Sequence, residues 1–310
     1  MAFSKKKIRV ILGWLVAVII IYFIGRQILT NRDELQNWNW QIDWIQAILS
    51  AMFLSAAYLC AAQAWRTIIA GFDHKIKLSE AFRVIYLANL GRYIPGKIWQ
   101  VFGMVGLAGE LNIPATTSLA SFALVQTYML PAGFIFMPIL LGQLQAIDGI
   151  MLYRSALYIF ATLVFIVFLV FFIRPGGLEW LLNKALRLFK RQPVTYRPAF
   201  GNRVAIFVWY AVTWVFFGAA FHFFIEAILE QSTIPLTYAA GIYITAYIIG
   251  YISFISPGGL GFREGVISAL LAPFLGLTVA GSVALINRVY ITVAEGIITL
   301  LALLTYRLKK

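Results

Sequence analysis

The feature that most constrains this chain is a series of apolar stretches long enough to cross a lipid bilayer. Six of them lie at about residues 8–29, 44–70, 115–141, 153–173, 203–228 and 278–306. A helix needs roughly 18 or more apolar residues to span the hydrocarbon core, and continuous runs of this length favour helices over the alternating strands of a membrane barrel. Hydrophobic residues make up 62% of the 310-residue chain, whereas soluble domains contain about 45–50%. The sequence therefore predicts an all-α, polytopic membrane protein with one transmembrane domain over residues 1–310.

Two further apolar stretches, at about 79–111 and 236–275, are interrupted by Pro-Gly pairs with charges beside them. A break in a membrane helix leaves backbone groups unpaired, at a cost of several kcal/mol per group unless protein or trapped water satisfies them. We therefore expect both breaks to line a polar cavity. In GRYIPGKIWQ, residues 91–100, the candidate site residues are Arg92, Pro95, Gly96 and Lys97. In SPGGLGFREG, residues 256–265, they are Pro257, Gly258, Gly259, Gly261, Arg263 and Glu264.

The positions of Lys and Arg predict how the chain threads the membrane, because these residues are held on the cytoplasmic side. Basic residues cluster at the N-terminus, at the C-terminus and in segment 174–203, where seven of them accompany Glu179 as the one acidic residue. We expect both termini and this basic loop to be cytoplasmic, and residues 8–29 to be a retained anchor, because the apolar part is too long for a signal peptide. The same clusters account for the net charge of +13 without a nucleic-acid partner.

The loop charges agree with six spans only if each broken stretch enters and leaves on the same face. This pattern predicts two re-entrant hairpins, the first dipping in from the cytoplasm and the second from outside. Each hairpin then lies between two spans, in a first repeat unit over 44–141 and a second over 203–306. Because the units begin on opposite faces, they would be inverted repeats, an arrangement that many transporters share. An eight-span arrangement, with both broken stretches crossing fully, is the alternative.

The last span carries two more candidate site residues, Arg288 and Glu295. They are seven residues apart, so two helical turns place them on one face. Charge at this depth costs at least about 2.5–3.5 kcal/mol, which favours a face turned to a polar interior. The alternatives are structural: an ion-pair ladder of Arg288 and Glu295, a pair between Glu264 and Arg263, and extension of Lys97 to the headgroup layer.

Other kinds of chemistry find little support in the sequence. One cysteine and two histidines leave no metal-ligand cluster and no internal disulfide framework. The run GGLGFREG matches neither standard nucleotide-binding pattern. We therefore expect no metal and no cofactor.

The segments NLGRYIPGKIW and ISPGGLGFREG resemble the signature segments of the lysylphosphatidylglycerol synthase transmembrane family, also called flippase-like domain proteins. The resemblance implies a multi-pass inner-membrane protein of bacterial or archaeal type that moves a lipid or lipid-linked headgroup between leaflets. The best-known members of this family join the module to a cytoplasmic synthase domain that attaches an amino acid to phosphatidylglycerol. Because this sequence ends four residues after Tyr306, we expect that activity to be absent.

Together these observations predict a non-enzymatic, flippase-like transporter of an anionic lipid or lipid-linked headgroup. Arg92, Lys97, Arg263 and Arg288 would hold the headgroup, because guanidinium and ammonium groups bind phosphate. Two alternatives stay open. One is a membrane scaffold that recruits a lipid-modifying or glycosyl-transferring enzyme through the basic loop 174–203. The other is a transferase acting on polyprenyl-linked sugars, for which Glu264 and Glu295 would have to supply the acidic pair.

Overall fold

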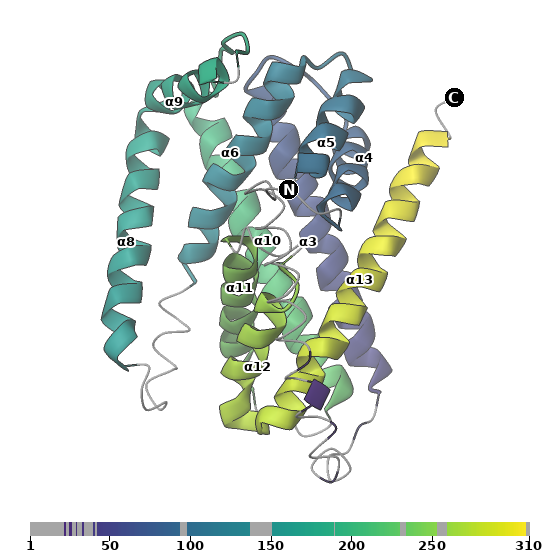
Figure 1. The fold of residues 1–310 in the computed structure, drawn as a ribbon. Coiled ribbons are helices and arrows are strands. Elements are labelled where there is room, and N and C mark those ends of the chain that lie inside the picture. Colours follow the sequence, from purple (N-terminus) through teal and green to yellow (C-terminus); the bar gives the residue numbers. More distant parts are fainter. Residues whose placement is uncertain are drawn as a thin grey trace, which may run out of the picture.

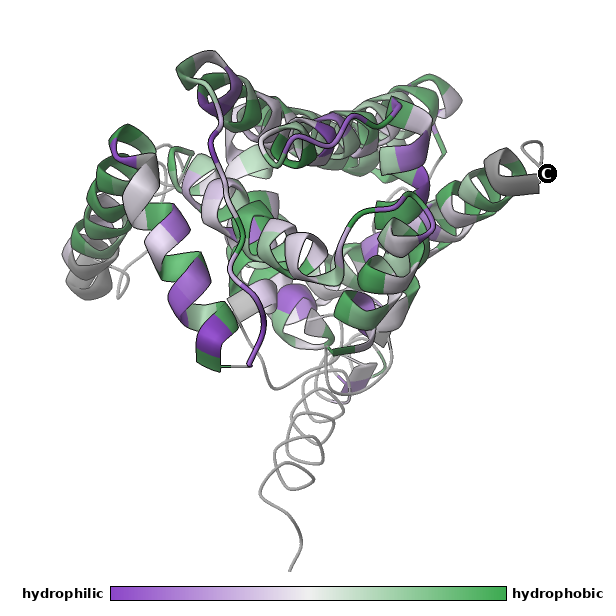
Figure 2. Ribbon diagram, turned by 90° about the horizontal axis from the view of Figure 1, so that it is seen from above, coloured by the Kyte–Doolittle hydropathy of each residue, from purple (hydrophilic) through white to green (hydrophobic). Residues whose placement is uncertain are grey.

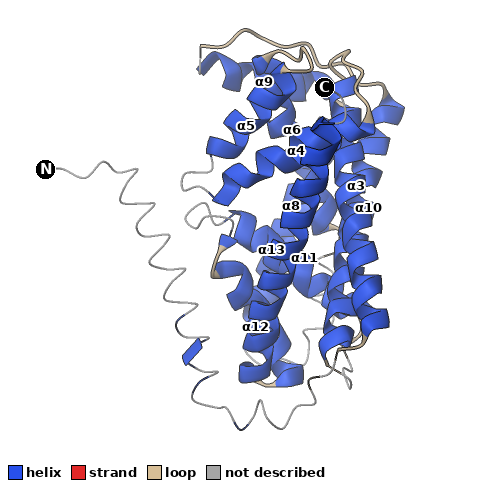
Figure 3. Cartoon of the chain, turned by 90° about the vertical axis from the view of Figure 1, so that its right-hand side faces the viewer, coloured by secondary structure: helices blue, strands red, loops and turns tan. Residues whose placement is uncertain are grey.

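The computed structural model describes residues 42–93, 98–136, 151–188, 190–229, 234–252 and 259–307, together with Trp40 and a few isolated positions between residues 22 and 33. Within these ranges the ordered elements are ten α-helices and one short 3-10 helix, and there is no strand (Figure 3). The predicted all-α class is therefore confirmed.

Two long helices form the centre of the bundle and run in opposite directions. They are α3 (Trp44–Ala70) and α10 (Phe200–Ile228). Asp43 starts α3, because its carboxylate accepts hydrogen bonds from the first free N–H groups of the helix, the shorter being 2.8 Å. The Asp43 N–H then donates to the carbonyl of Ala227 over 2.9 Å, which ties the beginning of α3 to the end of α10.

A pair of shorter helices follows α3 and folds back on itself. The pair comprises α4 (Leu78–Asn89), which continues into the 3-10 helix η1 (Leu90–Tyr93), and α5 (Ile98–Gly109). Both helices lie in the upper half of Figure 1. The close approach requires a residue without a side chain at Gly91, because a Cβ there would collide with the backbone at the start of α5. The predicted site residues Pro95, Gly96 and Lys97 lie outside the described residues.

A second pair of helices follows α10 in the same way. It comprises α11 (Leu236–Ile252) and α12 (Phe262–Leu275), and both lie in the lower half of Figure 1. Gly259 has a φ of +73°, and a Cβ there would lie 3.0 Å from the carbonyl oxygen of Gly250. Glycine is therefore needed at this position both for its backbone conformation and for the close contact with α11. Pro257 and Gly258 lie outside the described residues.

A longer helix follows each pair: α6 (Ala115–Phe134) follows the first and α13 (Leu277–Arg307) the second. The order of elements therefore recurs, with a long helix, two shorter helices around a break, and another long helix. The larger core cluster joins both halves around α3 and α10, and a smaller one joins α4 and α5 to the end of α3. The units 44–141 and 203–306 stay predictions.

Between the two halves, α8 (Met151–Ile173) and α9 (Pro175–Leu188) meet at a bend of 100°. The buried Arg203 donates to the carbonyls of Phe172 and Ile173 and so satisfies the C-terminal end of α8. Because of the bend, α9 lies at the upper end of the bundle and runs in a different direction from α8 (Figure 1). Figure 2 looks onto this end, where hydrophilic residues alternate with hydrophobic ones along the nearest elements.

Three described helices are long and apolar enough to cross a membrane: α3, α10 and residues 277–304 of α13. The bent pair of α8 and α9 would make a fourth if it is counted as one span. The apolar helices support the expected multi-pass membrane protein. Of the other expected spans, 8–29 lies almost entirely outside the described residues, and α6 covers only the first 20 residues of 115–141. The total of six spans stays a prediction.

Candidate functional site

A cavity of about 360 Å³ lies between the two pairs of shorter helices, and both pairs contribute to its wall. The long helices α3, α6, α10 and α13 complete it. Among the described residues that line it, the charged ones are Arg92, Arg263, Arg288 and Glu295. The tertiary structure therefore brings together at one cavity residues from both breaks and from the last span, and their role in binding a headgroup stays a prediction.

Arg92 forms an ion pair with Glu295, so that the first break contacts α13. Glu295 has a second partner, because the hydroxyl of Tyr58 donates to its Oε1 over 3.3 Å. The carbonyl of Tyr58 in turn accepts a 2.6 Å hydrogen bond from the hydroxyl of Tyr86 in α4. These contacts form one connected network between α3, α4, η1 and α13.

Glu264 is 1% exposed and connects the second break to the same helix. Its Oε2 accepts a 2.6 Å hydrogen bond from the N–H of Gly261, directly before α12. A carboxylate in the first turn of a helix is also stabilised by the helix dipole. Its Oε1 lies 3.6 Å from Nη1 of Arg288 in α13. The described ion-pair partner of Glu264 is thus Arg288.

Arg263 has a different environment from the other two arginines. Its guanidinium lies 4.4 Å from the ring centre of Tyr243 and 5.5 Å from that of Tyr247. The residue is 8% exposed, and its Nη2 has no hydrogen-bond partner among the described residues. Such cation–π contacts are worth about 2 kcal/mol or more when desolvated, less than a full complement of hydrogen bonds to a guanidinium. An anion that reached Nη2 would supply an acceptor for this buried donor.

The described ion pairs of Arg288 and Glu295 lead to two different partners. Arg288 faces Glu264 at the second break, and Glu295 binds Arg92 at the first. The seven-residue spacing does place both on one helix face, and that face is turned towards the cavity. One helix of the second half therefore contacts both breaks.

Much of the cavity wall consists of residues that the sequence did not single out. Tyrosines are prominent in it: Tyr58, Tyr86, Tyr210, Tyr243, Tyr247 and Tyr251. The last three recur every four residues along α11, a spacing that places them on one face and was visible in the sequence. The lining residues from α5 and α6 are mostly apolar: Ile98, Val101, Met104, Phe122, Val125 and Met129. Gln126 adds a buried Oε1 with no hydrogen-bond partner among the described residues.

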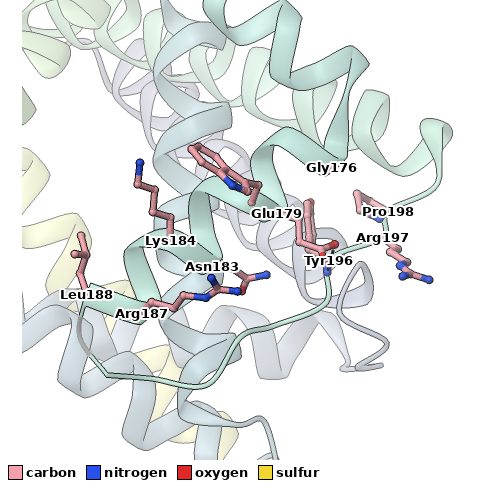
Figure 4. A pocket seen from close by; sticks show the side chains of 10 residues that line it. Gly176, Glu179, Asn183, Lys184, Arg187, Leu188, Tyr196, Arg197 and Pro198 are labelled. Carbon is pink, nitrogen blue, oxygen red and sulfur yellow. Dashed lines mark hydrogen bonds between the residues drawn. The ribbon is translucent and has the colours of Figure 1, made fainter.

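A second hollow, of about 990 Å³, lies at the surface between α9 and the coil that follows it (Figure 4). Asn183 holds the coil in place, because its amide donates to the carbonyl of Val194 and accepts from the N–H of the same residue. Burial raises the pKa of the Tyr196 phenol, which stays neutral. Lys184 and Arg197 point in different directions in Figure 4 and do not converge on one point. This surface suits many weak contacts better than one tightly held ligand.

Within the described residues, no group of three or more His, Cys, Asp or Glu side chains is placed to hold a metal ion. The two carboxylates near the cavity, the buried Glu264 and the half-buried Glu295, are each engaged by a different arginine. The charged groups of the site are therefore arranged as two separate ion pairs and an additional guanidinium.

Comparison with known proteins places the chain in a membrane-protein family. No curated protein matches the sequence. The family described as Lysylphosphatidylglycerol synthase TM region matches residues 10–298, which is nearly the whole chain. This match agrees with the resemblance of the two Pro-Gly segments and connects the chain with a membrane domain related to lipid modification. The chain belongs to the Lysylphosphatidylglycerol synthase TM region family.

Proposed function

We propose that the protein is a flippase-like transporter, which moves an anionic lipid or lipid-linked headgroup between the leaflets of the cytoplasmic membrane without catalysing a chemical step. One observation carries this proposal: three arginines line the cavity against two nearby carboxylates, and the third of them, Arg263, is in neither described ion pair. Ionisable groups inside a membrane are costly and are retained where they bind a substrate or an ion. The planar guanidinium is well suited to phosphate.

The lining of the cavity supports an amphiphilic substrate. The arginines come from η1, α12 and α13, whereas the part of the wall that comes from α5 and α6 is mostly apolar. A phosphate group would bind at the arginines, and the acyl chains would lie along the apolar wall and in the bilayer. A soluble anion would gain nothing from that wall.

We propose further that the pairs α4–α5 and α11–α12 are re-entrant hairpins that enter from opposite faces, within inverted repeats and six spans. With 12 residues each, α4 and α5 are about 18 Å long, well short of the roughly 30 Å hydrocarbon core. Their position at the end opposite to α11 and α12 supports the same arrangement (Figure 1). Rocking of one repeat against the other would then expose the cavity to each leaflet in turn.

The test is reconstitution of the purified protein in liposomes, with leaflet exchange measured for labelled phosphatidylglycerol and phosphatidylcholine. We expect the protein to accelerate exchange of the anionic lipid, and Arg263→Gln to reduce that rate at least tenfold. Arg187→Gln, on the surface of α9, removes a cation away from the cavity and should keep the wild-type rate. Exchange by folded Arg263→Gln at the wild-type rate would rule out the cavity as the headgroup site.

The scaffold is the second candidate, and the surface of α9 favours it. Trp180 and Leu188 are exposed on this helix, beside Lys184 and Arg187. An exposed apolar and basic helix at the membrane surface suits the headgroup layer or a partner protein. If the scaffold is correct, neutralising Lys184, Arg187, Lys190 and Arg191 together will cost more function than any change in the cavity. The transferase alternative has less support, because Glu264 and Glu295 are bound by different arginines.

A further inference from the structure

Glu295 occupies an unusual position for a residue of an anion site. It lines the cavity, and its carboxylate binds the guanidinium of Arg92, one of the groups proposed to hold the headgroup. Carboxylate and phosphate both present oxygen pairs that match the guanidinium fork. A phosphate that approaches Arg92 from the cavity therefore competes with Glu295 for the same donors.

The contacts around Glu295 allow it to be displaced. The Tyr58 hydroxyl already donates to Oε1 over 3.3 Å, so a carboxylate that lost Arg92 would keep one hydrogen-bond donor. This matters because a buried charge without a partner is strongly destabilising. Both side chains are also partly accessible, at 22% for Arg92 and 15% for Glu295.

Glu264 is built differently and does not compete in this way. It is 1% exposed and does not line the cavity. Its second oxygen is held by the N–H of Gly261 at the start of α12. A ligand that displaced Glu264 from Arg288 would have to act against this fixed position. The two carboxylates near the cavity therefore have different roles.

We infer that Glu295 is an internal competitor for Arg92, which the phosphate of the substrate displaces when it binds, and that this exchange sets the affinity of the site. The inference rests on the proposed function and deepens it. Displacement would break the described ion pair between the first break and α13, while the Arg288–Glu264 contact at the second break is kept. Binding would thus remove one polar contact between the two halves of the molecule, while the shared core is kept.

The expected effects on affinity have opposite signs. If the ion pair is formed nine-tenths of the time, it lowers the apparent affinity about tenfold. Glu295→Gln should therefore tighten anion binding about tenfold, whereas Glu295→Asp keeps the competing charge and should stay much closer to wild type. Tyr58→Phe should weaken binding several-fold, because the displaced carboxylate loses the hydrogen bond from the Tyr58 hydroxyl. If the network had only a structural role, Glu295→Gln and Tyr58→Phe would both bind the anion more weakly than wild type.

The experiment is calorimetric titration of the full chain in an uncharged detergent. The probes are dihexanoylphosphatidylglycerol, inorganic phosphate as an anion without acyl chains, and dihexanoylphosphatidylcholine as a zwitterionic lipid. Glu226→Gln, in α10 and outside the cavity lining, is the matched control and should leave binding unchanged. If Glu295→Gln binds only the short-chain anionic lipid more tightly, the result would support Glu295 as a competitor and a lipid as the ligand of the site. If inorganic phosphate also binds more tightly, the result would support Glu295 as a competitor at a site that accepts any phosphate group.

Two outcomes would overturn the inference, and they can be told apart. Binding of the anionic lipid by wild type, with equal or weaker binding by Glu295→Gln, would overturn the competitor and leave the transporter proposal standing. No binding of any anionic probe by wild type or Glu295→Gln would overturn both. Thermal unfolding of each variant in the same detergent establishes that the protein titrated is folded.

Discussion

Replacement of Glu264 is the sharpest test of how the second break is stabilised. Its two oxygens have separate partners, the N–H of Gly261 at 2.6 Å and Nη1 of Arg288 at 3.6 Å. Glu264→Gln keeps an acceptor for the N–H but removes the charge. Glu264→Ala removes both. The two variants therefore separate the end of α12 from the ion pair.

The structure gives the expected magnitudes. Removing one member of a buried ion pair costs about 3–5 kcal/mol. Because Arg288 lines the cavity and is partly accessible, we expect about 2–3 kcal/mol for Glu264→Gln. Glu264→Ala also leaves the buried Gly261 N–H without its acceptor, which adds about 1–3 kcal/mol. The predicted order of stability is wild type, then Gln, then Ala.

The assay is the free energy of unfolding in mixed detergent micelles, followed by circular dichroism as a denaturing detergent is added. A double-mutant cycle with Arg288→Gln isolates the ion pair. Equal losses of unfolding free energy for Glu264→Gln and Glu264→Ala would show that the hydrogen bond to Gly261 does not contribute to stability. A coupling energy of zero with Arg288→Gln would refute the ion pair as a stabilising contact.

Two further replacements test other parts of the fold. Gly259→Ala should destabilise the protein by about 2–4 kcal/mol, because it combines a positive φ with overpacking against α11. The control is Gly106→Ala, where a Cβ meets nothing within 4 Å, and this variant should show no measurable loss of thermal stability. Arg203→Gln should cost about 1–3 kcal/mol by removing the donors that end α8, and faster hydrogen exchange in the last turn of that helix, with unchanged exchange in α3, would be its signature.

The spans were the part of the fold most open to prediction. The predicted stretch 44–70 matches α3 at both ends, and 278–306 differs from α13 by one residue at each end. Hydropathy predicts such helices because lipid requires every backbone group to be paired within the segment. Both breaks were predicted for the same reason, since Pro and Gly interrupt that pairing. The side-chain partners were harder: the sequence placed Arg288 and Glu295 on one face but did not show which charges of other helices they contact.

What the sequence determined by itself is the membrane class, the long helices, the two breaks and the charges that meet at them, because each depends on local composition along one helix. The tertiary structure decided which charges are partners. Arg92 lies far from Glu295 in the sequence, and they meet because α13 packs against the first half of the chain at a particular depth and rotation. Nor does hydropathy distinguish the tyrosine face of α11 from its other apolar faces. Pairing across helices depends on how they pack, and packing is a property of the whole bundle.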